Sequence, residues 1–268
     1  MAGIALGALG PPLWNSREKT KNDLMLPMIL QRLRSFLPVY AHLSLRVPKI
    51  LFLMPLSYPG RAMIRSFAAT TGWKNPADKI ENHATCGRLE EIIGQQGVRI
   101  LFPTAEFGDV STYELYVLNS LVKALRPKNI FEIGTLHGRT TVNLLDNADE
   151  LETLYTLDIM EDLPGNRFAG HPRSAKVKRI VCDSRDLDVR PYRNMMDLIF
   201  IDADHTYDAV LGDSAKALEM LSAKGAIAWH DYTSVSDTKR ACHEFMRQNP
   251  GRRYVHVKDT SLLVMLAD

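Results

Sequence analysis

The stretch FEIGTLHGRTT, residues 131–141, decides the fold that we predict for this 268-residue chain. It joins a short apolar run containing Glu132 to two glycines, Gly134 and Gly138, and residues 139–141 then begin a helix-like pattern. Gly134 permits a sharp turn and a close approach of the backbone to a ligand, and Gly138 lets a helix start tightly against that turn. The spacing E-x-G-x-x-x-G differs from the G-x-G-x-x-G fingerprint that admits a dinucleotide pyrophosphate. The stretch predicts a strand, a ligand-facing glycine loop and a helix.

More short apolar runs follow the glycine loop, and most of them end in an acidic residue. Their apolar residues are continuous rather than alternating, which is typical of strands buried on both faces of a parallel sheet covered by helices. Residues 110–125 have apolar residues at helical spacing, with Ser111 and Glu114 forming a capping box, and residues 209–223 also indicate a helix. The predicted strands are NIFEIG (129–134), LYTLDI (154–159), VKRIVCD (177–183), DLIFID (197–202) and AIAWHD (226–231).

Two further runs at the C-terminal end, RYVHVKD (253–259) and SLLVMLA (261–267), predict a closing antiparallel hairpin. The whole pattern predicts an α/β protein with a Rossmann-like doubly wound sheet, mostly parallel, and a helical N-terminal extension. We assign residues 1–95 to a basic, apolar extension or cap and residues 96–268 to the main domain. Within the segment that joins them, residues 88–97 indicate a helix that is followed by an extended lead-in.

The composition is that of an ordinary globular protein, with 46% hydrophobic and 24% charged residues. Three scattered cysteines, Cys86, Cys182 and Cys242, are too few for a disulfide framework or a CxxC-type zinc site, so we expect a reducing, cytoplasmic compartment. Residues 1–70 hold nine basic and two acidic residues, whereas the remainder holds 24 basic and 29 acidic ones. The chain therefore joins a basic head to a mildly acidic body.

The basic head, residues 1–70, has two interpretations. Its N-terminus lacks the charged n-region of a secretory signal, and its longest clean apolar run, residues 50–56, is far shorter than the roughly 20 residues of a membrane-spanning helix. Apolar residues mixed with Arg and Lys suit a helix that lies in a membrane interface and contacts anionic lipid. The alternative is a helical cap on the body. Prolines at 38, 48, 55 and 59 break any long amphipathic helix and favour the cap.

Acidic residues at the strand ends suggest how a ligand is held, because ligands of open α/β sheets collect at the carboxyl ends of the strands. Asp158 ends the second predicted strand 24 residues after Gly134, where it can accept hydrogen bonds from ribose hydroxyls. Asp183 ends the third strand, where it can meet an adenine amino group. A turn glycine and helix caps in some other doubly wound protein are the alternative explanation of these residues.

These pieces together resemble the class I S-adenosylmethionine-dependent methyltransferases, over roughly residues 108–268. The resemblance rests on FEIGTLHGRTT, LYTLD, VCDS and IFIDADHTYDAV occurring in this order at suitable separations. It implies that Glu132 and Gly134 line the methionine part of the donor, with Gly138 in the same loop. It further implies that Asp158 binds the donor's ribose and that Asp183 lies on its adenine side.

A second group of polar residues follows the fourth and fifth predicted strands. The segment IDADH, which contains Asp202, Asp204 and His205, resembles the metal-dependent O-methyltransferases, in particular the macrocin O-methyltransferase and cephalosporin hydroxylase-like group, and more distantly the catechol and caffeoyl-coenzyme A O-methyltransferases. The resemblance implies that Asp202 binds a divalent cation and that His230 and Asp231 complete its ligands.

The histidine in this second group departs from the family pattern, which has an acidic pair at that position. Magnesium prefers oxygen ligands, so His230 either shifts the preference toward manganese, iron or zinc or leaves the cation weakly held. The alternative is that Asp202 caps the following helix and His230 pairs with a neighbouring carboxylate. Asp204 either caps the helix near Tyr207 or contacts the donor's amino group.

The resemblance implies methyl transfer from S-adenosylmethionine to a hydroxyl of a small-molecule acceptor, such as a sugar, polyketide or phenol, assisted by Mg or Mn. His205 is the expected proton acceptor, because a neutral imidazole suits proton transfer at physiological pH. We expect no nucleic-acid partner, and both peripheral membrane contact through residues 1–70 and homo-oligomerisation stay open. One alternative is a membrane-associated or partner-binding protein with a non-catalytic methyltransferase-like scaffold. The glycine spacing disfavours a nicotinamide-dependent oxidoreductase.

Overall fold

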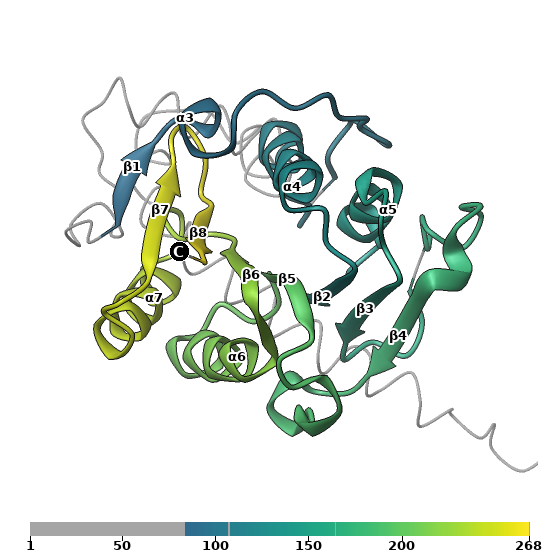
Figure 1. Cartoon of the computed structure of the whole chain (residues 1–268). Helices are drawn as coiled ribbons and strands as arrows, with labels where there is room; N and C mark the ends of the chain where they lie inside the picture. The colour runs from purple at the N-terminus through teal and green to yellow at the C-terminus, as the bar shows by residue number, and fades with distance from the viewer. Residues whose placement is uncertain (1–83, 107, 164, 268) are drawn as a thin grey trace, which may run out of the picture. The chain divides into compact units, whose positions relative to one another are not determined.

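The computed structural model of the chain describes residues 84–106, 108–163 and 165–267 (Figure 1). The predicted main domain of residues 96–268 lies almost wholly within these ranges. The basic head, with its interfacial-helix and cap interpretations, lies outside them. None of the helices in the described ranges is long and apolar enough to cross a membrane.

One eight-stranded sheet organises the described residues, in the order β1-β7-β8-β6-β5-β2-β3-β4. All neighbouring pairs are parallel except those of β8, which runs antiparallel to β6 and β7. This confirms the predicted fold class, a mostly parallel Rossmann-like sheet closed by an antiparallel hairpin. The strands are β1 (Thr85–Gly87), β2 (Asn129–Ile133), β3 (Thr153–Asp158), β4 (Val177–Val181), β5 (Met196–Ile201), β6 (Leu221–Trp229), β7 (Arg253–Val257) and β8 (Leu263–Leu266).

Helices cover both faces of the sheet, as Figure 1 shows. The alternation of side chains along β2 explains the two layers, since Phe131 and Ile133 enter the apolar core shared with α6 and α7, whereas Ile130 enters the core shared with α3, α4 and α5. The helices are α3 (Leu89–Ile93), α4 (Thr112–Leu125), α5 (Arg139–Asn147), α6 (Tyr207–Met220) and α7 (Ser236–Gln248), and three 3₁₀ turns are η3 (Ser174–Lys176), η4 (Ser184–Asp186) and η5 (Arg190–Tyr192).

The helix boundaries agree with the sequence prediction at α4 and differ at α6. The predicted capping box is present, since the Ser111 hydroxyl accepts from the Glu114 amide and the Glu114 carboxylate accepts from the Ser111 amide. The predicted helix at 209–223 is wrong at its end, because Leu221 has extended backbone and begins β6. Pairing of Leu221 with Met196 on β5 overrides the helical preference of the sequence. The predicted helix at 88–97 shortens to the five residues of α3.

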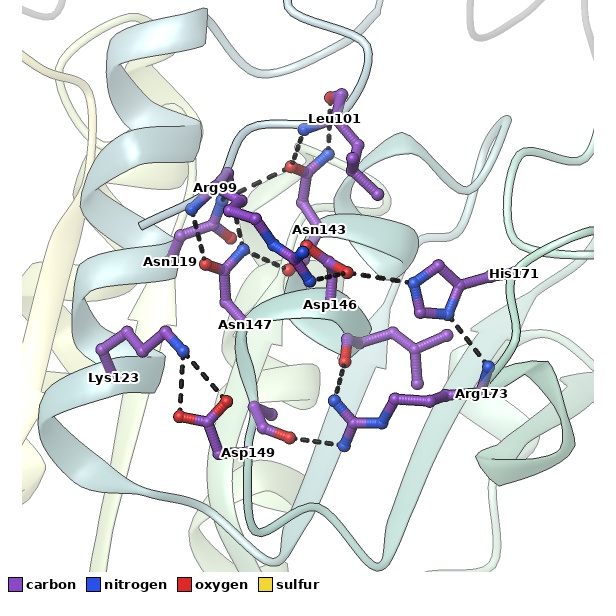
Figure 2. A network of polar contacts seen from close by, with 12 residues as sticks. Arg99, Leu101, Asn119, Lys123, Asn143, Asp146, Asn147, Asp149, His171 and Arg173 are labelled. Atoms are coloured by element: carbon purple, nitrogen blue, oxygen red, sulfur yellow. Dashed lines mark hydrogen bonds and ion pairs between the residues drawn. The ribbon is translucent and has the colours of Figure 1, made fainter. Parts of the chain in front are cut away.

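Helix α5 holds the lead-in segment through a row of side chains four residues apart. The Asn147 side chain exchanges two hydrogen bonds with the backbone of Arg99, at 2.9 and 2.8 Å, and Asn143 does the same with Leu101, at 2.8 and 2.9 Å (Figure 2). One helical turn earlier, Arg139 donates to the carbonyls of residues 102, 103 and 110. An amide side chain that bonds both backbone groups of one residue replaces a β-strand partner. The lead-in thus lies fixed beside the start of α5.

The C-terminal end of α5 is closed by the segment that precedes β4. Arg173 donates to the carbonyls of Leu145 and Ala148, two acceptors that a helix end leaves without intrahelical partners (Figure 2). His171 lies 3.1 Å from the carboxylate of Asp146 in the same network. Both ends of the helix that follows the glycine loop are therefore held by other segments, and the loop has a rigid support.

Candidate active site

The glycine loop connects β2 to α5, and Gly134 forms its first turn. Gly134 has φ of 102°, and a Cβ added there would lie 2.3 Å from the backbone oxygen of Asp202, at the end of β5. The Gly134 amide donates to the Leu157 carbonyl at 2.8 Å, and the Asp202 amide donates to the Ile133 carbonyl at 2.8 Å. Glycine is required here because the end of β5 occupies the space of a side chain. The close approach that the sequence indicates is made to the protein's own backbone.

Gly138 begins α5 in the left-handed region, with φ of 73°. Its amide donates to the Thr135 carbonyl at 2.8 Å, which closes the loop into a turn. A Cβ added to Gly138 would lie 2.5 Å from the ring of Phe168. This confirms that Gly138 starts the helix tightly, and it identifies the Phe168 ring as the group that lies against it.

Glu132 is completely buried within β2, on the face toward α5. Its Oε2 accepts hydrogen bonds from the hydroxyls of Thr141 and Thr156, whereas its Oε1 has no hydrogen-bond partner among the described residues. Burial raises the pKa of Glu132 to about 8, although the two hydroxyls act in the opposite direction, and the nearby Asp202 and Asp158 raise it further. The buried carboxyl group therefore keeps its proton near neutral pH, and a cationic group of a ligand placed at its open oxygen would favour the ionised form.

Replacing Glu132 with glutamine should make the stability of the folded protein depend less on pH between about pH 5 and pH 8. The folded pKa lies above the ordinary value of 4.5, so the native carboxyl keeps a proton that the unfolded chain releases, and stability falls as pH rises from about 4.5 to about 8. This cost is on the order of 3–5 kcal/mol at the upper end, and Glu132→Gln removes it. Thermal unfolding of both proteins at about pH 5 and pH 8 measures the effect. Parallel pH profiles of the two proteins would show that Glu132 ionises normally.

Asp158 ends β3 and holds the glycine loop. Its Oδ2 accepts from the amides of Thr135 and Leu136, at 3.0 and 2.9 Å, and its Oδ1 accepts from the amide of Met160 at 2.9 Å. A carboxylate has about four acceptor positions, so a hydroxyl can still be accommodated. The structure therefore gives Asp158 a loop-organising role beside the ribose contact that the sequence predicts.

Asp183 and Asp204 lie at the ends of β4 and β5, respectively, each with a local partner. Asp183 forms a bidentate ion pair with Arg185, which lowers the pKa of Asp183, and it also caps η4. The exposed Asp204 accepts from the Thr206 amide at 2.9 Å, a short-range bond just before α6. Asp204 thus bonds the residue that precedes α6, next to the helix start where the sequence places it as a cap. Arg185, the charged partner of Asp183, is a residue to which the sequence does not point.

Four side chains converge beside the glycine loop, just beyond the carboxyl ends of β5 and β6. They are Asp202, His205, His230 and Asp231. Their ligand-type atoms all lie within 4.8 Å of one another. Asp202 Oδ1 is 3.1 Å from His230 Nδ1 and 3.5 Å from His205 Nε2, and Asp231 Oδ2 is 3.0 Å from His205 Nε2 and 3.6 Å from His230 Nδ1. The sequence groups three of these residues as a metal site, and His205 joins the same cluster.

This cluster, the carboxylate–histidine cluster, has the dimensions of a cation site. Two ligands about 2.1 Å from a metal ion at right angles lie about 3 Å apart, close to the shorter distances observed. A cavity of about 10 Å³ adjoins Asp202, His205 and His230, which is about the space of one water molecule or ion. Because imidazole nitrogen joins the two carboxylate oxygens in this cluster, its donor atoms fit a divalent transition metal better than magnesium.

The charges of the cluster favour a positive group at its centre. Burial by itself would lower the pKa of His230, but Asp202, Asp231 and Glu114 raise it well above 6.5. Burial would likewise raise the pKa of Asp202, and the charges and hydrogen bonds of His230 and His205 lower it below its ordinary value. A divalent cation can take the place of this positive charge.

Glu114 is a residue of the site that sequence reasoning placed only in a helix cap. Its Oε2 lies 3.3 Å from His230 Nε2, and its Oε1 accepts from the amide and hydroxyl of Ser261, at 2.7 and 2.6 Å. Burial would raise the pKa of Glu114, but His230 and the bonds from Ser261 hold it well below its usual range. Because Glu114 engages Nε2, His230 presents Nδ1 to the cluster, an arrangement typical of carboxylate–histidine–metal sites.

Asp231 has a left-handed backbone, with φ of 57°, directly after β6. Its carbonyl accepts from the amides of Ser234 and Val235, which form the turn before α7. Aspartate tolerates this conformation better than most residues, yet it still carries strain of about 1 kcal/mol. The turn directs the Asp231 carboxylate back toward His205 and His230.

Comparison with known proteins indicates the class of the fold. Residues 131–232 match the family model described as a methyltransferase domain, and this segment contains every site residue predicted from the sequence. No curated protein matches the chain. Residues 131–232 are thus similar to the methyltransferase-domain family, and they lie within a mostly parallel, Rossmann-like sheet.

Solved structures similar to the chain include several methyltransferases. A putative caffeoyl-CoA O-methyltransferase from Staphylococcus aureus has a TM-score of 0.50 at 15% identity, over 76% of this chain and 98% of that one. The O-methyltransferase TomG from Streptomyces achromogenes, in complex with SAM, has a TM-score of 0.49 at 18% identity, over 60% and 82%. An O-methyltransferase from Bacillus cereus, in complex with SAH, has a TM-score of 0.47 at 20% identity, over 59% and 83%. At these identities the likeness concerns the fold.

Proposed function

We propose that the protein transfers a methyl group from S-adenosylmethionine to a hydroxyl oxygen of a small-molecule acceptor, with the help of a divalent cation. One observation carries the proposal: the glycine loop after β2 and the carboxylate–histidine cluster after β5 and β6 share a wall. Gly134 packs directly on the backbone of Asp202, so a donor on the loop and a cation in the cluster would be neighbours. The match of residues 131–232 to a methyltransferase domain supports the same reading.

The donor would be held at the carboxyl ends of β2 and β3. Glu132, with its open Oε1, would face the amino group of the donor's methionine part, and Asp158 would accept from the ribose hydroxyls. Asp183 would serve the adenine side once its exposed partner Arg185 moves. S-adenosylmethionine, when bound, supplies a methyl group on a positively charged sulfur.

The acceptor would react above the carboxylate–histidine cluster. Asp202, His230 and Asp231 would hold the cation, which when bound lowers the pKa of the acceptor hydroxyl. His205 would take the hydroxyl proton as the oxygen–methyl bond forms and the sulfur–methyl bond breaks. The remaining contribution of the protein is to hold the two reactants in line.

Replacing His205 with alanine tests whether this residue moves a proton or binds the cation. If it is the base, His205→Ala should lower turnover by about 10²–10⁴-fold while Mn²⁺ and donor affinities stay within a few fold of wild type. A parallel loss of Mn²⁺ affinity would instead make His205 a ligand. Full turnover in the variant would remove it from the reaction.

The acceptor class is tested by following release of S-adenosylhomocysteine with panels of phenols, sugars and polyketides. We expect release that depends on a hydroxyl compound and increases with added Mn²⁺ or Mg²⁺, and none from an Asp202→Ala protein. Matched amines and thiols serve as controls. Product formed from amines or thiols but from none of the hydroxyl compounds would contradict oxygen methylation.

A further inference from the structure

A second hollow lies along one face of α7. Its volume is about 720 Å³, and it is bounded by α7, the segment leading into β7, the first residue of β1 and the first residue of α6. We call it the arginine cleft, after the four arginines among its lining residues: Arg240, Arg247, Arg252 and Arg253.

Positive charge dominates the arginine cleft. Its lining includes one carboxylate, Glu244, which pairs with Arg247. Arg240 pairs with the exposed Asp237 and lies over the Tyr207 ring, 5.2 Å from its centroid. Within the described ranges, the guanidinium groups of Arg252 and Arg253 form no ion pair. The charge is concentrated in an otherwise mildly acidic body, so it requires an explanation other than overall composition.

The shape and lining of the cleft suit a small organic anion. Tyr207, Met246, Pro250 and Tyr254 provide apolar surface between the charged groups. Guanidinium groups offer paired N–H donors that match the oxygens of a phosphate, and several of them can bind one dianion together. A hollow that combines apolar walls with convergent polar groups is typical of small-ligand sites.

We propose that the arginine cleft binds the phosphate group of a soluble small-molecule phosphate. The basic head of the chain is a poor occupant on charge grounds, since residues 1–70 carry nine basic and two acidic residues. The cleft also has a defined position relative to the candidate active site, because Tyr207 follows His205 by two residues and α7 begins shortly after Asp231. The proposal does not depend on methyl transfer.

Calorimetric titration of the full-length protein with inorganic pyrophosphate and with phenyl phosphate tests the cleft. We expect saturable binding that weakens at least about 10-fold in an Arg247→Gln/Arg253→Gln protein, because charge-assisted hydrogen bonds are lost. Both side chains are exposed, so the variant should unfold at the wild-type temperature. Arg190→Gln, which changes an exposed arginine paired with Asp188 outside the cleft, should bind as wild type does.

Other outcomes decide against the proposal. Equal weakening in the Arg190→Gln control would mean that the anions respond to overall charge, and undetectable binding of both phosphates would leave the cleft without this ligand. In a separate arm, the protein is sedimented with vesicles of phosphatidylcholine and phosphatidic acid. Vesicle binding that needs Arg247 and Arg253, without binding of the soluble phosphates, would assign the cleft to a lipid surface and overturn the proposal.

Discussion

Replacing Asp202 with alanine should abolish specific binding of a divalent cation. Asp202 Oδ1 lies within 3.5 Å of both histidines of the carboxylate–histidine cluster, and its carboxylate is almost entirely buried. Losing it removes one of two negative charges from the four ligand-type side chains, so we expect Mn²⁺ affinity to fall by more than about 100-fold. Titration of the protein with Mn²⁺, followed by electron paramagnetic resonance, measures this directly.

Two further variants grade the effect. Glu114→Gln keeps the shape of a side chain that contacts His230 from outside the cluster, and it should weaken Mn²⁺ binding by about 10–100-fold. Asp208→Ala removes an exposed carboxylate from the first turn of α6 and should leave binding unchanged. If Asp202→Ala and Asp208→Ala bind Mn²⁺ equally, the cluster is an ion-paired structural group and holds no metal.

The second large effect is expected for Gly134→Ala. The added methyl group would lie 2.3 Å from the Asp202 oxygen, and alanine would be forced to φ near 102°. The strained backbone costs about 1–3 kcal/mol and the overlap a similar amount, so the protein should lose on the order of 2–6 kcal/mol of stability. For a domain of this size, each kcal/mol corresponds to about 2–4 °C in Tm.

A matched glycine provides the control for that experiment. Gly212 is exposed within α6, and a Cβ added there meets no atom within 4 Å. Gly212→Ala should therefore raise stability by about 0.5–1 kcal/mol through helix propensity. Calorimetric unfolding of the two variants should give opposite signs. A Gly134→Ala protein as stable as wild type would mean that the ends of β2 and β5 separate easily. The glycine loop and the carboxylate–histidine cluster would then not be held next to each other.

The sequence predicts central strands such as β2 and β5 well because burial on both faces leaves a strong pattern, whereas the three-residue β1 is not predicted at all. Within β5, residues 198–201 are continuously apolar and Asp202 follows them directly, so both the type of the element and its end can be identified. The boundary between α6 and β6 fails for the opposite reason. Leu221 is compatible with a helix, and only its pairing with Met196 on another strand makes it extended.

The residues of the candidate site that directly follow strands can be predicted from the sequence, whereas a residue that a helix supplies, such as Glu114, cannot. Asp202 and Asp231 end neighbouring strands, so their meeting follows from the order of the sheet. Glu114 lies 116 residues from His230, and its capping role already accounts for its place in the sequence. The contacts of Asn143 and Asn147 with the lead-in segment cannot be predicted either, because the sequence does not show that a polar residue of a helix bonds the backbone of a distant segment.

The central claim, binding of a methyl donor at the β2–β3 edge, is tested most directly by calorimetric titration of the full-length protein with S-adenosylmethionine, with NAD as the comparison ligand. We predict saturable binding of S-adenosylmethionine and of S-adenosylhomocysteine, and no binding of NAD. In Asp158→Ala the donor affinity should fall by about 30–150-fold, because the ribose contacts and the support of the glycine loop are both lost. Failure of the folded wild-type protein to bind S-adenosylmethionine, or an Asp158→Ala protein that binds it equally well, would contradict the claim.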